Sequence, residues 1–266
     1  MKKILIVCVN YNSYQELHNY LASIERAAQL CPNVKVEVIV ADNSTKEEEI
    51  NTTSFVNISV SVRKYDNLGY LGAAQEVINK CDDLTVYDFV AISNVDLRIK
   101  EDFVCKLDAV LIDNDVAWIA PTIWSECEGR NRNPKVMQRY SRRKLEIINL
   151  MYRFPLLDWI YTNTAYKKKK EQSEAPEQNI YAGHGSFMLL TKHFFERHSK
   201  IQYPIFLFGE ELYLAELIRE SNQKVLFAPK LVVYDTEHVS TGSMKKKFYY
   251  KCNKEAIEYI IKKFYE

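Results

Sequence analysis

Apolar positions along the first 120 residues alternate between the spacing of buried strands and the spacing of helices. Residues 4–9 form a continuous apolar run, as expected for a strand covered on both faces. Leu17, Leu21 and Ile24 then recur at three- and four-residue intervals, which predicts a helix that begins after Ser13. The same order continues with strands predicted at 34–41, 58–63, 87–93 and 116–120 and helices at 71–78 and 103–111. Strands that alternate with helices predict an α/β protein with a mostly parallel sheet flanked by helices.

The alternation stops in the middle of the chain, where residues 125–180 are rich in Arg, Lys and aromatic side chains. Regular patterns then predict a strand at 185–191, a helix at 210–220, a strand at 224–228 and a helical tail at 244–266. The chain has no internal repeat and no Gly/Ser-rich linker. We therefore expect one domain over residues 1–243, interrupted by a basic-aromatic insertion at about 125–180, and a C-terminal helical tail at 244–266.

Polar residues follow three predicted strands at the ends where open α/β sheets bind ligands. These segments are Asn10-Tyr11-Asn12, Asp42-Asn43-Ser44 and Asn94-Val95-Asp96. The first lacks the glycines of a dinucleotide site, which argues against a nicotinamide or flavin enzyme. Each segment also suits an ordinary strand end, turn or helix cap. Asn94 and Asp96 point to the same side of an extended segment, and such an oxygen pair suits Mg²⁺ or Mn²⁺ bridging phosphates.

Three later segments carry further candidate chemistry. Asn67-Leu68-Gly69 precedes a helix whose N-terminus could face an anion. Glu210 and Glu211 open another helix after an aromatic run. Acidic residues are favoured there by the helix dipole, but adjacent carboxylates beside an apolar segment could also supply a general base. His238 lies beyond the last predicted strand, and a lone histidine is more often structural than a ligand.

Taken in this order, the motifs resemble the family 2 glycosyltransferases with the GT-A (Rossmann-like) fold, and in particular the rhamnosyltransferase-like branch of bacterial polysaccharide glycosyltransferases. The resemblance spans about residues 3–243. The segments that carry it are Val9-Asn10-Tyr11-Asn12, Val40-Ala41-Asp42-Asn43-Ser44, Asn67-Leu68-Gly69, Asn94-Val95-Asp96, residues 183–190, Phe206-Leu207-Phe208-Gly209-Glu210-Glu211 and His238. Each motif is short, but seven of them in the family's order are jointly specific.

The resemblance implies a role for each matching residue. The positions that match nucleotide-sugar-binding residues are Asn10, Tyr11, Asn12, Asp42, Asn67, Gly69, Asn94 and Val95. Asp96 matches the second acid of the family's metal-binding Asp-x-Asp, and His238 matches a supplementary metal or diphosphate contact, so the implied cofactor is Mg²⁺ or Mn²⁺. Glu211 matches the catalytic base, with Glu210 beside it. Asn94 departs from the Asp-x-Asp pattern, and its amide oxygen is a weaker, neutral ligand.

The function implied by the resemblance is inverting transfer of a sugar from a nucleotide-diphosphate sugar to a hydroxyl of a saccharide or lipid-linked acceptor, in cell-surface polysaccharide synthesis. The alternative is a non-catalytic or nucleotidyltransferase-like nucleotide-binding protein. A nucleotidyltransferase would need a Gly-rich, basic loop after the first strand, which residues 10–13 do not provide. A nucleic-acid binder built on residues 130–170 is disfavoured by the acidic Asp96 and Glu210-Glu211 segments, so we expect no nucleic acid as a partner.

The net charge of +1 hides an uneven distribution. Residues 130–170 carry twelve Lys or Arg and two acidic residues, a net charge of +10, and the tail at 244–266 has a net charge of +4. The remaining residues have a net charge of −13. Basic residues flanking an apolar, aromatic run suit a membrane surface with anionic lipids. The same segments could instead be solvated, or could stack on the sugar rings of an acceptor.

Cysteine usage and the N-terminus bear on the compartment. The six cysteines include no Cys-x-x-Cys pair, which argues against a structural zinc site and favours a reducing compartment. The first apolar run is only six residues long and lacks a small-residue cleavage site, so it does not match a signal peptide. We expect a cytoplasmic protein that can attach peripherally to the inner face of the plasma membrane.

Overall fold

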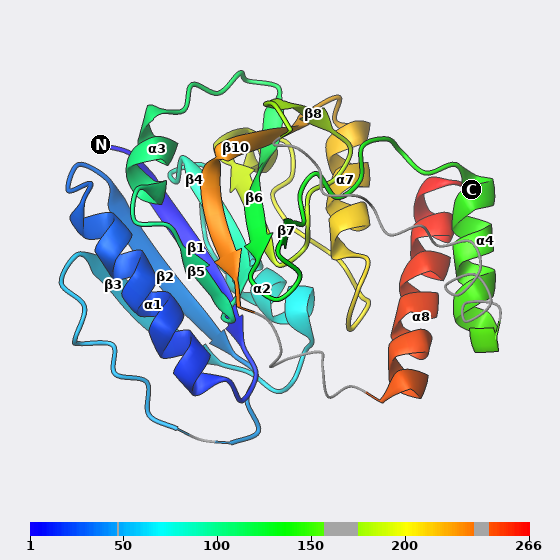
Figure 1. Ribbon diagram of the computed structural model, residues 1–266, viewed down its shortest axis with the longest axis horizontal. Helices are drawn as coiled ribbons and strands as arrows, with labels where there is room; N and C mark the ends of the chain where they lie inside the picture. The colour runs from blue at the N-terminus through cyan, green and yellow to red at the C-terminus, as the bar shows by residue number, and fades with distance from the viewer. Residues whose placement is uncertain (47, 157–174, 237–244) are drawn as a thin grey trace.

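The computed structural model describes residues 1–46, 48–156, 175–236 and 245–266 (Figure 1). Within them, ten strands form one sheet in the order β3-β2-β1-β4-β9-β6-β10-β5, with β7 paired to β6 and β8 paired to β10. The strands are β1 (Lys3–Asn10), β2 (Lys35–Asp42), β3 (Ile58–Lys64), β4 (Phe89–Asn94), β5 (Leu97–Ile99), β6 (Val116–Ser125), β7 (Arg130–Asn131), β8 (Gln178–Ile180), β9 (Phe187–Thr191) and β10 (Lys224–Asp235).

The sheet is mostly parallel, as the alternating pattern predicts. β3, β2, β1 and β4 pair in parallel, and β10 pairs in parallel with β6. β9 lies antiparallel between β4 and β6, so β6 and β10 run in the same direction as the first four strands. The short strands β5, β7 and β8 are also antiparallel to their neighbours. The expected α/β fold is therefore confirmed.

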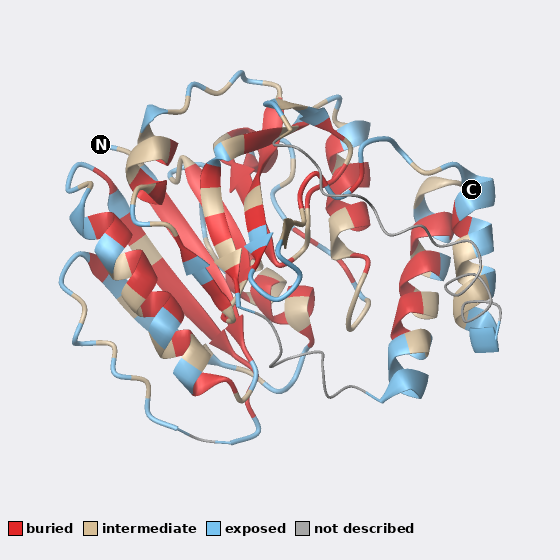
Figure 2. Ribbon diagram, in the orientation of Figure 1, coloured by how far each residue is buried: buried red, intermediate tan, exposed pale blue. Residues whose placement is uncertain are grey.

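Helices cover both faces of the sheet. They are α1 (Tyr14–Gln29), α2 (Tyr70–Asn79), α3 (Phe103–Ala109), α4 (Arg142–Arg153), α6 (Lys192–Phe195), α7 (Glu210–Glu220) and α8 (Lys246–Phe264). Alternate residues of β1 enter separate cores because successive strand side chains point to opposite faces. Ile4 and Ile6 pack in the core that contains α1 and α3, whereas Leu5 and Val7 pack in the core that contains α2 and α7. Figure 2 shows the buried strands between these layers.

Helices α4 and α8 lie side by side and antiparallel, at the end of the molecule beyond α7 (Figure 1). Tyr152 near the end of α4 contacts Tyr249 near the start of α8, with ring centroids 6.2 Å apart. At the other end, Arg142 donates to the carbonyl of Tyr265 at 3.2 Å. α4 lies within the basic-aromatic insertion and α8 within the C-terminal tail, so segments predicted as separate features form one helical pair.

A buried carboxylate attaches this helical pair to α7. Glu216 of α7 is fully buried, and its two oxygens accept hydrogen bonds from Arg139 at 2.8 and 3.2 Å. Arg219 and Tyr181 also donate to it, at 2.7 and 2.6 Å. Arg139 in turn donates to the carbonyl of Phe264 at the end of α8. These donors lower the pKa of Glu216 against the opposing effect of burial, so the carboxylate stays charged.

The sequence pattern predicted the central elements well and the insertion poorly. α4 was not predicted because its first turn carries Arg142, Arg143 and Lys144, where the helix dipole favours acids. Its N-cap is Ser141, whose side chain accepts from the Lys144 amide. None of the helices in the described ranges combines the length and apolar character needed to cross a bilayer.

Candidate active site

A pocket of about 870 Å³ lies at the carboxyl ends of the strands, bounded also by the start of α7 and by α4 and α8. Eight of the predicted site residues line it: Tyr11, Asn67, Gly69, Asn94, Val95, Asp96, Glu210 and Glu211. Asn10, Asn12 and Asp42 lie outside the lining. His238 falls outside the described residues, so its predicted role stays a prediction.

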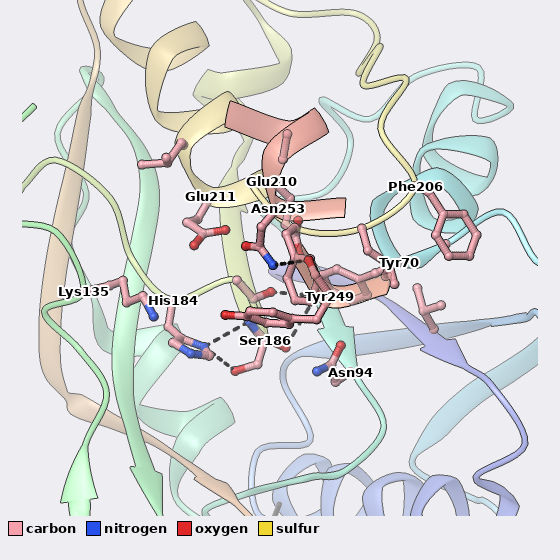
Figure 3. A pocket seen from close by; sticks show the side chains of 18 of the residues that line it. Tyr70, Asn94, Lys135, His184, Ser186, Phe206, Glu210, Glu211, Tyr249 and Asn253 are labelled. Atoms are coloured by element: carbon pink, nitrogen blue, oxygen red, sulfur yellow. Dashed lines mark hydrogen bonds between the residues drawn. The ribbon is translucent and has the colours of Figure 1, made fainter. Parts of the chain in front are cut away.

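Glu210 and Glu211 stand on one side of the pocket and Asn94 on the other (Figure 3). Both glutamates are partly buried at the first turn of α7. Burial and then the charge of Glu211 raise the pKa of Glu210 to about 8. Glu210 is therefore mostly protonated at neutral pH. A carboxylic acid kept neutral beside a second carboxyl group is a common arrangement in acid–base catalysis.

The segment His184–Ser186 lies between the glutamates and the end of β4. Asn94 donates its backbone amide to the Ser186 carbonyl at 2.9 Å. A Cβ on Gly185 would lie 3.4 Å from Cγ of Glu210 and 3.5 Å from Oε2 of Glu211, so the glutamates pack directly on this glycine. The Tyr70 hydroxyl fixes the segment by donating to the Gly185 carbonyl at 2.8 Å.

Asn94 and Asp96 are the predicted metal-binding positions. Both line the pocket at the end of β4, and the Asp96 carbonyl accepts from Thr236, next to the end of β10. No cluster of three or more His, Cys, Asp or Glu suited to a metal ion occurs within the described part of the chain. One carboxylate and one amide oxygen still fit Mg²⁺ or Mn²⁺ when diphosphate oxygens and water complete the shell. The residues present suit a metal that binds together with a diphosphate.

The remaining predicted nucleotide-binding residues form a network behind the pocket. Asn10 and Asp42 are paired across β1 and β2, and the Asn10 amide donates to Asp42 at 3.0 Å. Asp42 also accepts from the hydroxyls of Ser44 at 2.5 Å and Tyr14 at 3.1 Å. Asn12 has a φ of 54° and accepts from the backbone amides of residues 45 and 46. The network fixes the two strand-end loops, and direct contact with a base or ribose stays a prediction.

Gly69 is required by a close backbone approach. Its φ of 78° and ψ of −176° lie in a region that is essentially restricted to glycine. The carbonyl oxygen of Phe206 would lie only 1.8 Å from a Cβ at this position. Asn67 accepts from the Gly69 amide at 3.2 Å, and Asn43 donates to the Gly69 carbonyl at 2.9 Å. Gly69 therefore allows the segment before Glu210 to pack against the start of α2 at the edge of the pocket.

The structure adds pocket residues that the sequence did not assign to a role. The basic-aromatic insertion and tail supply one wall, formed by Tyr140, Ile148, Tyr152, Phe248, Tyr249 and Asn253. A second group lies near the strand ends and comprises Arg132, Lys135, His184 and Asp235. Asp235 was missed because β10 was predicted to end at residue 228, before a register shift after Ala228. Lys135 was counted only as part of the basic segment.

Comparison with known proteins identifies the class to which this fold and pocket belong. The model of glycosyl transferase family 2 matches residues 5–190. The match covers more than half of the chain, and the protein belongs to this family. A search of curated proteins found no significant match.

Solved structures share the fold at low sequence identity. TarS 1–349 from S. aureus aligns at 12% identity with a TM-score of 0.55, over 89% of this chain and 60% of that chain. GalNAc-T7 with UDP, GalNAc and Mn²⁺ aligns at 13% identity with a TM-score of 0.62, over 98% of this chain and 48% of that chain. The mannosyltransferase PcManGT from Pyrobaculum calidifontis, with GDP-Man and Mn²⁺, aligns at 12% identity with a TM-score of 0.51, over 90% and 58%. This chain thus spans three fifths or less of each of these chains, and the likeness confirms the GT-A fold.

Proposed function

We propose that this protein is an inverting glycosyltransferase that moves a sugar from a nucleotide-diphosphate sugar to a hydroxyl of a saccharide or lipid-linked acceptor. The observation that carries the proposal is that Glu210 and Glu211 stand across one pocket from Asn94, and that Asp96 lines the same pocket. An acid-base pair and a diphosphate-binding strand end are the two parts that this reaction needs. Membership of the family and the nucleotides or nucleotide sugars bound in the structural relatives support the same assignment.

Each part of the pocket has a task in this reaction. Glu211 accepts the proton of the acceptor hydroxyl while the oxygen attacks the anomeric carbon from the face opposite the leaving group. The bond from the anomeric carbon to the diphosphate oxygen breaks, and the electron pair leaves with the nucleoside diphosphate. Glu210, held neutral, limits the negative charge near the reacting centre. Tyr70 and Ser186 hold the intervening segment rigid, which fixes the distance between base and donor.

A divalent metal, Mg²⁺ or Mn²⁺, would be held by Asp96 with Asn94, and by His238 as the resemblance implies. When bound, it supplies electrostatic stabilisation of the charge on the departing diphosphate. Two of the structural relatives contain Mn²⁺, which supports this cofactor.

Thermal shift with UDP-, GDP- and dTDP-sugars, each with and without Mn²⁺, tests donor binding. A ligand at one hundred times its dissociation constant stabilises the folded state by about 2.7 kcal/mol. In a protein of this size, that stabilisation raises the melting temperature by roughly 5–10 °C. We expect such a shift with at least one sugar nucleotide and none with the free sugar. The absence of any nucleotide-dependent shift would contradict the proposal.

We also propose that the protein acts in bacterial cell-surface polysaccharide synthesis, attached peripherally to the cytoplasmic face of the membrane. Ile147 and Leu150 of α4 and the C-cap residue Phe154 lie at three- and four-residue spacing, and each is about half exposed. Arg143 precedes this apolar stripe by one turn and is exposed. An exposed apolar stripe beside cationic side chains suits an anionic lipid surface.

Flotation with liposomes tests the attachment. We expect binding to vesicles that contain phosphatidylglycerol and much weaker binding to phosphatidylcholine alone. The double variant L150S/F154S should lose binding while keeping its melting temperature, because both side chains are solvent-exposed. Equal flotation with both lipid compositions, or unchanged flotation of the variant, would refute attachment through α4.

A further inference from the structure

Strand β7 and the loop after it carry a cluster of cations beside the pocket. Arg130, Arg132 and Lys135 occupy six residues of sequence, and Arg132 and Lys135 line the pocket. Arg130 pairs with Glu128, and Arg132 pairs with Asp235 at 2.9 Å. Lys135 forms no ion pair or hydrogen bond within the described parts of the chain. Among these three cations, Lys135 is therefore the one that contacts no carboxylate of the described residues.

Contacts of the neighbouring residues Asn133 and Val136 hold Lys135 beside His184. The Asn133 side chain is buried, accepts from the His184 amide at 2.8 Å and donates to the Pro121 carbonyl at 2.8 Å. Three residues after Asn133, Val136 forms an antiparallel bridge with Ala182. Residues 133–136 therefore run alongside residues 182–184, with Lys135 between the two points of attachment. Figure 3 shows Lys135 and His184 together on the side of the pocket occupied by Glu211.

His184 is a fixed neutral hydrogen-bond donor. Its Nδ1 accepts from the Ser186 backbone amide at 3.2 Å and lies 2.9 Å from the Ser186 hydroxyl. Because Nδ1 accepts from an N–H group, the ring proton is on Nε2. Burial lowers the pKa of His184 well below its usual value, and the charges of Lys135, Arg132 and Arg130 lower it further. No partner of Nε2 is found among the residues that the structure describes, so this N–H group is available to a ligand.

We propose that Lys135 and His184 form a phosphate-binding subsite in the pocket. An ammonium group beside a neutral N–H donor matches the oxygens of a phosphate group, which accept charge-assisted hydrogen bonds. The cationic surroundings explain why a neutral histidine is suitable there, since it donates without adding another buried charge. The inference rests on the proposed function, and it adds a second anchor for phosphate besides Asn94 and Asp96.

Two sources could supply this phosphate: the diphosphate of the donor, or a phosphate group of the acceptor. The subsite lies against the His184–Ser186 segment, which contacts both the strand end at Asn94 and the pair Glu210-Glu211. A phosphate held there is therefore within the same pocket as the donor and the base. If the phosphate belongs to the donor, Lys135 affects the dissociation constant of the nucleotide. If it belongs to the acceptor, Lys135 affects the dissociation constant of the phosphate-bearing acceptor.

Isothermal titration calorimetry of the full chain separates the sources. The probes are UDP, GDP, uridine and guanosine, and then inorganic phosphate and glycerol 3-phosphate added to protein saturated with the tighter nucleotide. The variant K135Q removes the charge from an exposed side chain, and K200Q is the matched control because Lys200 is exposed and outside the pocket. H184Q tests the second donor, with melting temperatures measured for every variant.

A donor diphosphate predicts that K135Q weakens UDP or GDP binding about tenfold or more, while nucleoside binding and the K200Q protein are unchanged. An acceptor phosphate predicts unchanged nucleotide binding but loss of inorganic phosphate or glycerol phosphate binding. Unchanged affinities for all phosphate probes in K135Q would overturn the subsite and leave the proposed function standing. Phosphate binding that depends on Lys135 in a protein that binds no nucleotide would support the subsite and overturn the proposed function. A wild-type protein that binds none of the phosphate probes would overturn both.

Discussion

Replacement of Gly69 by alanine would introduce a Cβ 1.8 Å from the carbonyl oxygen of Phe206 and 2.8 Å from its carbonyl carbon. Both atoms belong to the backbone, so no side-chain rotation relieves the contact. The backbone conformation of Gly69, with φ at 78° and ψ at −176°, also disfavours any residue with a Cβ. The segment that begins at Phe206 leads directly into Glu210, so the displacement reaches the acid-base pair.

The two effects set the expected size of the change. An unfavourable backbone conformation of this kind costs about 1–3 kcal/mol, and overpacking costs about another 1–3 kcal/mol. Together they lower the free energy of unfolding by about 2–6 kcal/mol, which corresponds to roughly 5–20 °C in melting temperature for a chain of this length. Thermal unfolding followed by circular dichroism measures the change.

Gly129→Ala is the matched control, because Gly129 has a φ of 61° but nothing within 4 Å of a Cβ. This substitution should lower the free energy of unfolding by about 1–2 kcal/mol, the cost of the left-handed backbone conformation alone. A melting temperature for G69A equal to that of G129A would refute the close approach between Gly69 and Phe206.

Two further predictions concern α7 and its attachments. The pKa of Glu210 is raised from 4.5 to about 8 in the folded state, so protonated Glu210 contributes to the free energy of unfolding. That contribution is complete below about pH 4.5 and is lost as the pH rises through 8. The melting temperature of E210Q minus that of wild type should therefore increase between pH 6 and pH 9. A difference that does not change with pH would contradict the raised pKa. R139A, which removes two hydrogen bonds to buried Glu216, should lower the free energy of unfolding by about 1.5–3 kcal/mol in urea denaturation. K251A removes only an exposed pair with Glu255 and should cost about 0.3–0.5 kcal/mol, so equal losses would refute the anchoring role of Glu216.

The central sheet could be predicted because its strands are continuous apolar runs that end in polar residues. The register of β1 with its neighbours aligns Asn10 with Asp42 and Val9 with Asn94, so the strand ends meet as predicted. The local apolar pattern is sufficient to predict these strands, because a strand that is buried on both faces must be apolar at nearly every position.

The wall of the pocket could not be predicted because it depends on contacts between distant segments. α4 begins with three cations and has Leu145 as its one fully buried residue, so its own sequence signals no core-facing helix. It is held by α8 and by the pair of Arg139 with Glu216, two residues that are 77 positions apart in the chain. Lys135 likewise gains its position from the bridge between Val136 and Ala182. Such pairings have no signature in a single sequence.

The most direct test of the account is turnover of the best-binding sugar nucleotide by wild type and E211Q, measured as release of nucleoside diphosphate with simple saccharides or water as acceptor. Loss of a general base predicts a turnover number about 10²–10⁴-fold lower in E211Q, with the dissociation constant of the nucleotide unchanged. E220Q, which alters an exposed carboxylate at the far end of α7, should behave as wild type. Turnover by E211Q at the wild-type rate, or no turnover by the wild-type protein, would contradict the assignment of this pocket as the site of glycosyl transfer.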